Sequence, residues 1–341
     1  MRALVYDGPE RLHLEERADP LPSTGEVVVA VRASGICGSD VHGYLGTTGR
    51  RTPGVVMGHE AAGVVSGVGR GVTTLVPGDH VVLRSILPCG ACDQCRRSRP
   101  NVCVDRRGLG MHLDGAYADA VVLPQEALLR IPPDLVFEEA ALIEPLAVAL
   151  HAVAITPMAP QDSVAIIGAG PIGLLTLLAV RRLGVAQVHV TDRSSHRLLV
   201  ARALGATGTS NVTHDDAVGE ILDATGGQGA DVVFEAVGSS PTVDQSVRAA
   251  RLGAQVTWIG NSDPRVELGM QDVVTKELTL RGAYGYVDEF DDAARAIADR
   301  RMDVRPLIER RAPLDDAIEL FADLAQGRLD AVKVMLLPVA G

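Results

Sequence analysis

The sequence predicts an α/β protein in which a β-rich, barrel-like domain is followed by a doubly wound parallel sheet. Between Met1 and about Pro133, short runs such as EVVVAVRA and DHVVL are separated by glycine and proline, a spacing typical of antiparallel strands. From Ser163 to about Ala283, apolar strand segments alternate with amphipathic helical segments, as βαβ units require. The 341 residues also exceed what one hydrophobic core usually serves, so two domains are expected.

These patterns set the predicted domain boundaries. Residues 1–150 form the β-rich domain, with an irregular lobe at 85–105 that has neither helical nor strand periodicity. Residues 151–284 form the parallel-sheet domain, which is reached through the helical segment EEAALIEPLAVALHAV. Residues 285–341 contain the helical stretch LDDAIELFADLAQ and the strand AVKVMLL, and we assign them to the first domain.

Composition and charge argue against several functional classes. A formal net charge of −11 disfavours a nucleic-acid partner, which would need a basic face, and 3% aromatic residues disfavour a base-stacking platform. Hydrophobic residues make up 47% of the chain, but no uninterrupted apolar run approaches a membrane span. Since no targeting segment is recognisable and the cysteines are expected to be reduced, we expect a soluble, cytoplasmic protein without a membrane partner.

Four of the five cysteines lie within fifteen residues, in the pattern C-x2-C-x2-C-x7-C: Cys89, Cys92, Cys95 and Cys103. Four thiolates at these separations suit one tetrahedral Zn²⁺ with no open ligand position, so this zinc would be structural. The alternative is a pair of disulfides or a set of solvated thiols. Disulfide-dense scaffolds are usually small secreted domains, and cysteines three residues apart would be strained in a bridge. The pattern therefore favours zinc.

The glycines Gly168, Gly170 and Gly173 form G-x-G-x-x-G directly after the apolar segment VAII and open the next helical segment. The first permits a tight turn, the second a close approach of pyrophosphate, and the third close packing of the helix on the sheet. Asp192 ends the next strand, nineteen residues beyond Gly173, where its carboxylate can bind ribose hydroxyls and repel a 2′-phosphate. The pattern predicts dinucleotide binding, with NAD favoured over NADP. The adjacent Arg193 could offset that repulsion; its alternative role is a solvated loop arginine.

Further cofactor contacts are expected beyond the carboxyl ends of the strands, where open α/β sheets bind their ligands. With the glycine loop, the expected set is Gly168, Gly170, Pro171, Ile172, Gly173, Asp192, Arg193, Arg197, Val237, Ile259, Gly260 and Tyr284. All of them lie within the predicted domain 151–284.

A second candidate metal site combines Cys37, in ICGSDVH, with His59 and Glu60, which begin twenty-two residues later. Sulfur, imidazole and carboxylate are all acceptable zinc ligands. A buried structural cysteine and a structural histidine are the alternatives. The segment from Gly58 to Val72 reads G-H-E-x2-G-x5-G-x2-V, which places the two candidate ligands inside a longer motif.

Together with the four-cysteine lobe, the glycine loop and the terminal VKVML, these motifs resemble the zinc-dependent medium-chain dehydrogenases over almost the whole chain. The resemblance implies a GroES-like catalytic domain and a Rossmann domain, with residues 285–341 folding back onto the catalytic domain. It also implies two zinc ions, hydride transfer between NAD(H) and an alcohol or ketone, and a homodimer or homotetramer.

Within that family, the resemblance points to the polyol branch. Members that oxidise simple aliphatic alcohols usually bring a second cysteine to the catalytic zinc, whereas here only Cys37 remains outside the lobe. Glu144, in LIEPLA, occupies the corresponding stretch, as in sorbitol-like and threonine dehydrogenases, and could alternate with Glu60 and water as a zinc ligand. Its alternative role is an N-terminal charge on a helix.

The resemblance also implies a proton relay that begins at Ser39 and runs through the nicotinamide ribose to His42. Zinc would polarise the substrate oxygen, just as it lowers the pKa of bound water from about 15.7 to about 7. A histidine with a pKa near its usual value of about 6.5 suits proton transfer at neutral pH. Asp40 would orient His59 through the nitrogen that does not bind zinc. The alternatives are a turn-forming serine and an exposed histidine.

The leading prediction is a zinc- and NAD-dependent dehydrogenase of a small secondary alcohol, such as a sugar alcohol, cyclitol or other polyol. An L-threonine or vicinal-diol dehydrogenase is the alternative within this class, although LRSILP lacks the histidine that threonine enzymes usually carry before the lobe. A non-catalytic, NAD-binding zinc–thiolate redox sensor is the alternative of another class. The loop GYLGTTGRRTPG, with Tyr44, Arg50 and Arg51, could select a polar or anionic substrate, or form a solvated surface.

Overall fold

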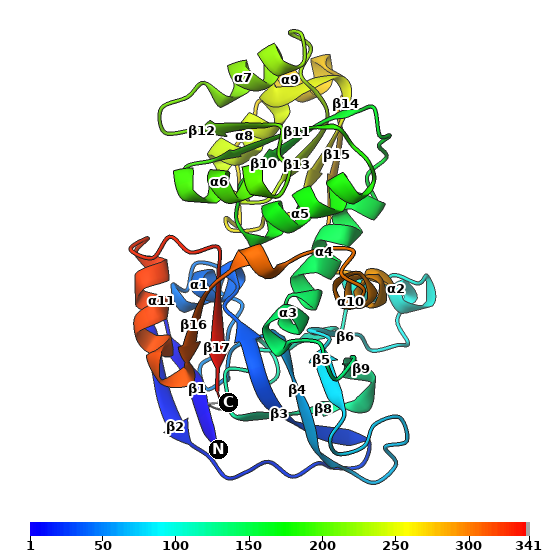
Figure 1. Ribbon diagram of the computed structural model, residues 1–341, viewed down its shortest axis with the longest axis vertical. Coiled ribbons are helices and arrows are strands. Elements are labelled where there is room, and N and C mark those ends of the chain that lie inside the picture. The colour runs from blue at the N-terminus through cyan, green and yellow to red at the C-terminus, as the bar shows by residue number, and fades with distance from the viewer. Residues whose placement is uncertain (339–341) are drawn as a thin grey trace. The chain divides into compact units, whose positions relative to one another are not determined.

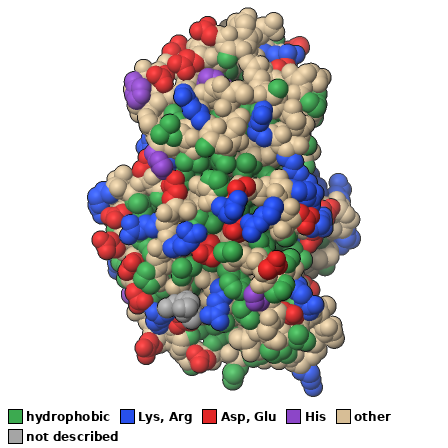
Figure 2. Space-filling model, viewed as in Figure 1, with side chains coloured by type: hydrophobic (Ala, Val, Ile, Leu, Met, Phe, Trp, Pro, Cys, Tyr) green, Lys and Arg blue, Asp and Glu red, His purple; other side chains and the backbone are tan. Residues whose placement is uncertain are grey.

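The computed structural model describes residues 1–338 and separates into two compact units, each built on its own sheet (Figure 1). The first unit comprises Met1–Ala147 and the chain from Val287 onward, and the second comprises Val148–Tyr286. Within residues 1–338, we find no helix with the length and apolar character needed to cross a membrane. On the face shown in Figure 2, acidic and basic side chains are interspersed.

The first unit is organised around a seven-stranded sheet in the order β16-β17-β3-β4-β5-β9, with β8 also paired to β3. All of these pairings are antiparallel except β16–β17. The strands of this sheet are β3 (Glu26–Gly35), β4 (Glu60–Val68), β5 (His80–Leu83), β8 (Ala120–Pro124), β9 (Leu128–Arg130), β16 (Ile308–Pro313) and β17 (Lys333–Leu337). Two hairpins complete the unit: β1 (Arg2–Gly8) with β2 (Arg11–Glu16), and β6 (Ile86–Leu87) with β7 (Arg107–Gly108).

Alternating valines explain why β3 lies at the centre of this sheet. Val27, Val29 and Val31 are fully buried on one face, and β-branched side chains pack well on a pleated surface. The strand β17 pairs antiparallel with the end of β3, in the register Met335↔Gly35. The C-terminal segment therefore extends the sheet that the N-terminal segment begins.

Short helices cover and connect these strands. They are α1 (Gly38–Tyr44), α2 (Asp93–Arg96), α3 (Phe137–Ala141), α4 (Ile143–Ala154, which continues into the second unit), α10 (Glu289–Ala298) and α11 (Ala317–Ala325), with 3₁₀ turns at Pro100–Val102, Gln125–Ala127, Arg305–Leu307 and Leu314–Asp316. The α11 side chain Phe321 is fully buried and lies 5.7 Å from the ring of Tyr44 and 5.8 Å from that of Tyr117. Burying one such ring contributes roughly 1.5–3 kcal/mol, so α11 is anchored by its apolar face.

The second unit is a six-stranded parallel sheet in the order β12-β11-β10-β13-β14-β15. Its strands are β10 (Ser163–Ile167), β11 (Gln187–Asp192), β12 (Gly208–Asn211), β13 (Ala230–Glu235), β14 (Ala250–Trp258) and β15 (Thr279–Gly282), and its helices are α5 (Pro171–Arg182), α6 (Ser195–Ala203), α7 (Ala217–Ala224), α8 (Ser240–Ala249) and α9 (Met270–Thr275). Every residue of β10 is buried, as expected for a strand of a parallel sheet that is covered on both faces. The chain order reverses between β10 and β13, which is where doubly wound sheets bind ligands. The predicted α/β class, with a β-rich domain and a doubly wound sheet, is confirmed.

Candidate active site

The first unit brings Cys37, His59 and Glu60 together, with one potential ligand atom from each lying within 4.8 Å of the others. Cys37 follows the end of β3 and forms the N-cap of α1, whereas His59 immediately precedes β4. The antiparallel pairing of these strands sets Gly35 opposite Glu60 and so joins motifs that are separated in the sequence. A thiol, an imidazole and a carboxylate converging in this way fit a zinc ion.

Asp40 is fully buried next to His59, and each of its two carboxylate oxygens accepts a hydrogen bond from a neighbouring side chain. Its Oδ1 atom lies 3.4 Å from Nδ1 of His59 and accepts a hydrogen bond of 2.5 Å from the Arg51 guanidinium. Its Oδ2 atom accepts a hydrogen bond of 2.5 Å from the Tyr117 hydroxyl. Burial alone would raise the pKa of Asp40, but His59 and Arg51 outweigh it and hold the pKa well below its usual range. A carboxylate at this position can orient the imidazole.

The carboxylate of Glu60 is paired with a buried lysine. Nζ of Lys333 donates to Oε2 of Glu60 at 2.6 Å and to the main-chain oxygen of Ile36 at 3.1 Å, and both charged side chains are 1% exposed. Burial lowers the pKa of Lys333, but the negative charges of Glu60 and Cys37 reverse this and raise it. A Cβ at Gly35 would lie 2.5 Å from Glu60 Oε2, so only glycine leaves room for the carboxylate. Lys333 was not among the predicted site residues; its position in VKVML, in a chain with few lysines, was the available signal.

Among the described residues, Glu144 is not a member of the cluster formed by Cys37, His59 and Glu60. It is the second residue of α4, and its Oε1 atom accepts a hydrogen bond of 2.5 Å from the Ser85 hydroxyl. Burial raises the pKa of Glu144 to about 7, and the negative charge of Glu60 acts in the same direction. The structure therefore places this carboxyl near the charges of the cluster, without bringing it to ligand distance of all three members.

The relay candidates Ser39 and His42 both lie on α1. The Ser39 hydroxyl donates a hydrogen bond to Sγ of Cys37 at 3.3 Å. His42 follows three residues later, so the two side chains share one helical face. The Ser39 hydroxyl thus contacts a member of the metal-ligand cluster, and His42, which is half-buried, follows nearly one turn later on α1.

Two of the three residues named in the segment GYLGTTGRRTPG are buried, so the alternative of a solvated surface was wrong for them. Tyr44 is buried against Phe321, because α11 presents an apolar face there. The Arg51 side chain is 2% exposed and binds Asp40, because a buried carboxylate needs a counter-charge. Only Arg50 of the three predicted loop residues is exposed.

The four lobe cysteines converge on a second point, with their sulfurs within 4.8 Å of one another. Sγ of Cys92 lies 3.5 Å from that of Cys95 and 3.7 Å from that of Cys103, and all the cysteines are free thiols. A disulfide would need about 2.05 Å, whereas four sulfurs at about 2.3 Å from a tetrahedral zinc lie about 3.8 Å apart. Backbone hydrogen bonds from Cys95 and Val104 lower the pKa of Cys92 to about 6. The geometry fits a closed zinc site and contradicts the disulfide alternative.

In the second unit, the glycine loop runs from the carboxyl end of β10 into α5, with Pro171 and Ile172 forming the first turn of the helix. Gly168 has a φ of +100°, and a Cβ there would lie 2.5 Å from Cγ2 of Val237. A Cβ on Gly173 would collide with the main-chain oxygen of Gly168. These positions require glycine, and the helix N-terminus beside them suits a pyrophosphate.

Asp192 ends β11 and is fixed against this loop. Its Oδ2 atom accepts a hydrogen bond from the amide of Ala169 at 2.6 Å, and its Oδ1 atom accepts one from the amide of Ser194 at 2.8 Å. Arg197, on α6, lies over the loop: its Nη1 atom would be 3.9 Å from a Cβ at Gly170. Arg193 lies in the turn between β11 and α6 and is exposed. The predicted adenosine-side residues are thus gathered at one end of the sheet.

The remaining cofactor candidates follow the next strands of the same sheet. Val237 comes after β13, Ile259 and Gly260 after β14, and Tyr284 after β15. Glu235, which was not predicted, accepts hydrogen bonds from the loops that follow β13 and β14. Its Oε1 atom accepts hydrogen bonds from the amides of Val237 and Gly238 at 2.8 and 2.7 Å, and its main-chain oxygen accepts those of Ile259 and Gly260 at 2.8 and 3.0 Å.

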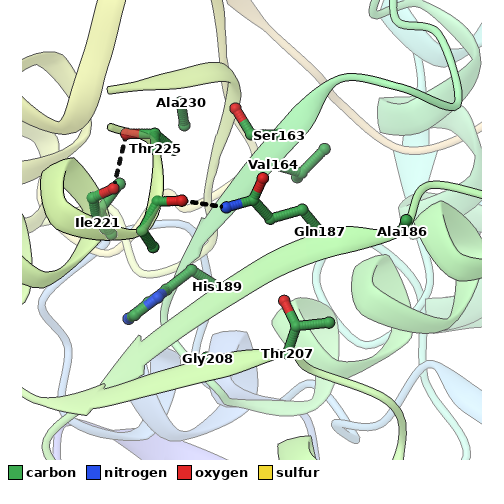
Figure 3. A pocket seen from close by; sticks show the side chains of 11 residues that line it. Ser163, Val164, Ala186, Gln187, His189, Thr207, Gly208, Ile221, Thr225 and Ala230 are labelled. Carbon is green, nitrogen blue, oxygen red and sulfur yellow. Dashed lines mark hydrogen bonds between the residues drawn. The ribbon is translucent and has the colours of Figure 1, made fainter. Parts of the chain in front are cut away.

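The second unit also contains a pocket of about 340 Å³ at the opposite, amino ends of the strands (Figure 3). It is lined by the starts of β10, β11, β12 and β13 and by the end of α7, and His189 projects into it. Nε2 of His189 lies 2.6 Å from the Ser210 hydroxyl, and burial lowers the pKa of this imidazole. Because the glycine loop follows the carboxyl end of β10, this pocket is not the expected cofactor site.

Comparisons with known proteins agree with this geometry. Residues 23–133 match the alcohol dehydrogenase GroES-like domain, and residues 171–299 match the zinc-binding dehydrogenase family. The chain is 32% identical to the sorbitol dehydrogenase of Bacillus subtilis (strain 168), with 99% of this chain and 97% of that protein covered. It is 34% identical to the L-threonine 3-dehydrogenase of Saccharopolyspora erythraea, with 97% and 98% covered.

A solved structure shares the whole fold. A putative zinc-binding dehydrogenase from Sinorhizobium meliloti 1021, bound to NADP, superposes with a TM-score of 0.92 at 32% identity, with 99% of each chain covered. The GroES-like and Rossmann fold class predicted from the sequence is therefore confirmed. By its motifs, its fold and these similarities, the chain belongs to the zinc-dependent medium-chain alcohol/polyol dehydrogenase family.

Proposed function

We propose that this protein is a zinc-dependent oxidoreductase that transfers hydride between NAD(H) and a secondary alcohol or ketone, namely a sugar alcohol, cyclitol or other polyol. The observation that carries the proposal is the convergence of Cys37, His59 and Glu60, with the Ser39 hydroxyl 3.3 Å from the Cys37 sulfur. A metal-ligand set and a proton-transferring hydroxyl thus occur together. The similarity to a sorbitol dehydrogenase supports the polyol as substrate class.

The proposed mechanism assigns a separate task to each residue. Zinc held by Cys37, His59 and Glu60 or Glu144 would act as a Lewis acid on the substrate oxygen. Asp40 fixes the orientation of the imidazole. Oγ of Ser39 would accept the proton of the substrate hydroxyl as the proton of its own hydroxyl passes to the next group of the relay.

A bound nicotinamide ribose would link Ser39 to His42, as the family resemblance implies. His42 would pass the proton on to solvent, since histidine is the side chain that most readily takes up and releases protons near neutral pH. A nicotinamide cofactor held by the second unit would supply the hydride acceptor. Val237, Ile259, Gly260 and Tyr284 would border its ring, because they follow the carboxyl ends of neighbouring strands.

NAD preference over NADP is part of this proposal and rests on Asp192. The related Sinorhizobium meliloti protein was solved with NADP, so the preference needs a direct test. We expect Asp192→Asn and Asp192→Ala to weaken NAD binding about 10- to 100-fold, since a hydrogen bond to a charged group contributes about 1.5–3 kcal/mol. NADP binding should be unchanged or tighter, because the repulsion of its 2′-phosphate is removed.

Cofactor dissociation constants for both variants, measured by the fluorescence of the reduced nicotinamide, check this expectation. Asparagine keeps an acceptor for the amide of Ala169, so it separates the loss of charge from a loosened loop. Asp223→Asn, an exposed carboxylate on α7, is the matched control. An unchanged ratio of NAD to NADP affinity in both Asp192 variants would rule out the proposed role.

The function itself is tested with a substrate panel and NAD⁺, by following NADH absorbance. We expect turnover of at least one sugar alcohol or cyclitol, loss of turnover on chelation, and recovery when zinc is returned. Faster oxidation of L-threonine or a vicinal diol would favour the alternative within the class, which the 34% identical threonine enzyme makes specific. A protein with two zinc ions that oxidises none of these alcohols would favour the redox-sensor alternative.

Two further expectations complete the proposal. The family resemblance favours a homodimer or homotetramer, which sedimentation equilibrium can measure. The expected reduced state of the cysteines favours a cytoplasmic location.

A further inference from the structure

Arg51 is buried although its surroundings, GRRTPG, have the composition of a surface loop. Its Nη2 atom donates a hydrogen bond of 2.5 Å to Oδ1 of Asp40, and its Nη1 atom donates one of 2.8 Å to the main-chain oxygen of Ser39. The arginine and aspartate side chains are 2% and 0% exposed. One guanidinium therefore binds two consecutive residues of α1, away from solvent.

These two residues serve different parts of the proposed chemistry. Ser39 carries the hydroxyl that lies 3.3 Å from the Cys37 sulfur. Asp40 lies 3.4 Å from Nδ1 of His59, and its other oxygen accepts hydrogen bonds from the Tyr117 hydroxyl and, at 3.3 Å, from the Cys37 amide. Arg51 thus contacts the residue that carries the relay hydroxyl and the residue that orients the imidazole.

Gly43 supplies the space that this arrangement needs. A Cβ at position 43 would collide with the Arg51 guanidinium, and the nearest three heavy atoms around it all belong to that side chain. Glycine inside a helix is less favourable than alanine by about 1 kcal/mol. Its presence in α1 is explained by the passage of the guanidinium against the helix.

We propose that Arg51 is a positioning residue, whose guanidinium fixes the Ser39 backbone and, through Asp40, the His59 imidazole relative to each other. This inference rests on the function proposed for the same site. The planar fork of arginine can bind a carboxylate oxygen and a carbonyl oxygen at once in fixed geometry. Lysine would return the charge without this fork, so it should not restore the arrangement.

The test compares Arg51→Met, Arg51→Lys and Gly43→Ala with Arg70→Met, an exposed arginine of the same unit. Zinc affinity is measured by competition with a chelator, and ligand geometry by the visible absorption of the cobalt-substituted protein. We expect the Arg51 and Gly43 variants to lose about 10- to 100-fold in zinc affinity and in kcat, the range found for groups that support metal ligands. NADH affinity should remain at the wild-type value, as it should in Arg70→Met.

A double variant checks whether Arg51 acts through Asp40. If it does, Arg51→Met should lower zinc affinity little further when Asp40→Asn is already present. Fully additive losses would contradict a shared route.

A purely structural role would appear differently. In that case the melting temperature falls while the chelator competition and the cobalt spectrum of the folded variants stay as in the wild type, and the inference is overturned. Gly43→Ala retains the guanidinium, so it provides a second test should Arg51→Met fail to fold. If the proposed dehydrogenase function is wrong, the wild-type protein oxidises no alcohol, but the comparison of zinc affinities remains informative.

Discussion

Cys37→Ser is expected to lower kcat by more than about 100-fold, because even residues that only support a metal ligand contribute 10- to 100-fold. Serine lacks the soft, readily ionised sulfur that zinc prefers. The same replacement exchanges the sulfur that accepts the Ser39 hydrogen bond for a hydroxyl oxygen on a shorter bond. Zinc content should fall from two ions per chain to one, and both quantities can be measured on one preparation by steady-state kinetics and elemental analysis.

The glycine loop lies in the second unit, so NADH affinity should not change in this variant. Cys92→Ser is the matched control: the same chemical change, one zinc ion lost, but the Cys37 cluster intact. A Cys37→Ser enzyme that turns over at nearly the wild-type rate would refute the catalytic-metal assignment. So would full activity in wild-type protein whose single zinc ion is bound by the four lobe cysteines.

The second large effect is expected on stability. Cys92→Ser should lower the melting temperature substantially, because structural zinc binding is worth about 10–16 kcal/mol in zinc-finger peptides, and that binding energy is folding energy. The lobe has few buried apolar side chains among the described residues. None of the four residues of α2, all within the described chain, is buried. Among the four cysteines only Cys103 is buried.

Calorimetry and limited proteolysis would show this effect together. We expect early cleavage between residues 85 and 105 in Cys92→Ser and in chelated wild-type protein, but not in Cys37→Ser. An unchanged melting temperature, together with a protease-resistant lobe after zinc removal, would show that the lobe does not depend on the metal.

Local patterns explain how much of the fold could be predicted. The β-branched alternation in EVVVAVRA and the burial of every residue in SVAII are properties of neighbouring residues, so β3 and β10 were accessible from the sequence. The glycine loop was accessible for the same reason: each glycine meets a steric requirement within one turn. The zinc site of the lobe could be predicted from the spacing of its four cysteines alone.

The counter-charges of the catalytic cluster could not be predicted in this way. Lys333 reaches Glu60 across 273 positions, and Tyr117 reaches Asp40 across 77. Such contacts depend on strand order, which periodicity does not reveal. Arg51 was misinterpreted for a related reason, since a loop composition says nothing about a buried carboxylate beneath it.

Glu144 could be identified as a candidate from its sequence motif, but its contacts could not be predicted. Its place in LIEPLA made it a candidate ligand, and the structure puts it close enough to feel the charges of His59 and Glu60. Its hydrogen bond to Ser85 could not be anticipated, because the serine lies 59 positions earlier in the chain. Among the described residues, the structure groups Glu60, and not Glu144, with Cys37 and His59.

Among the described residues, the strand that carries Lys333 follows every other helix and strand in the chain, and this sets the order in which the charged partners are made. Because the N-terminal part of a chain emerges first from the ribosome, Cys37, His59 and Glu60 are all made long before the ammonium that pairs with Glu60. The second unit, encoded in between, has all its strands available earlier. The charge of Glu60 is therefore balanced only after β17 has been made and has paired with β3.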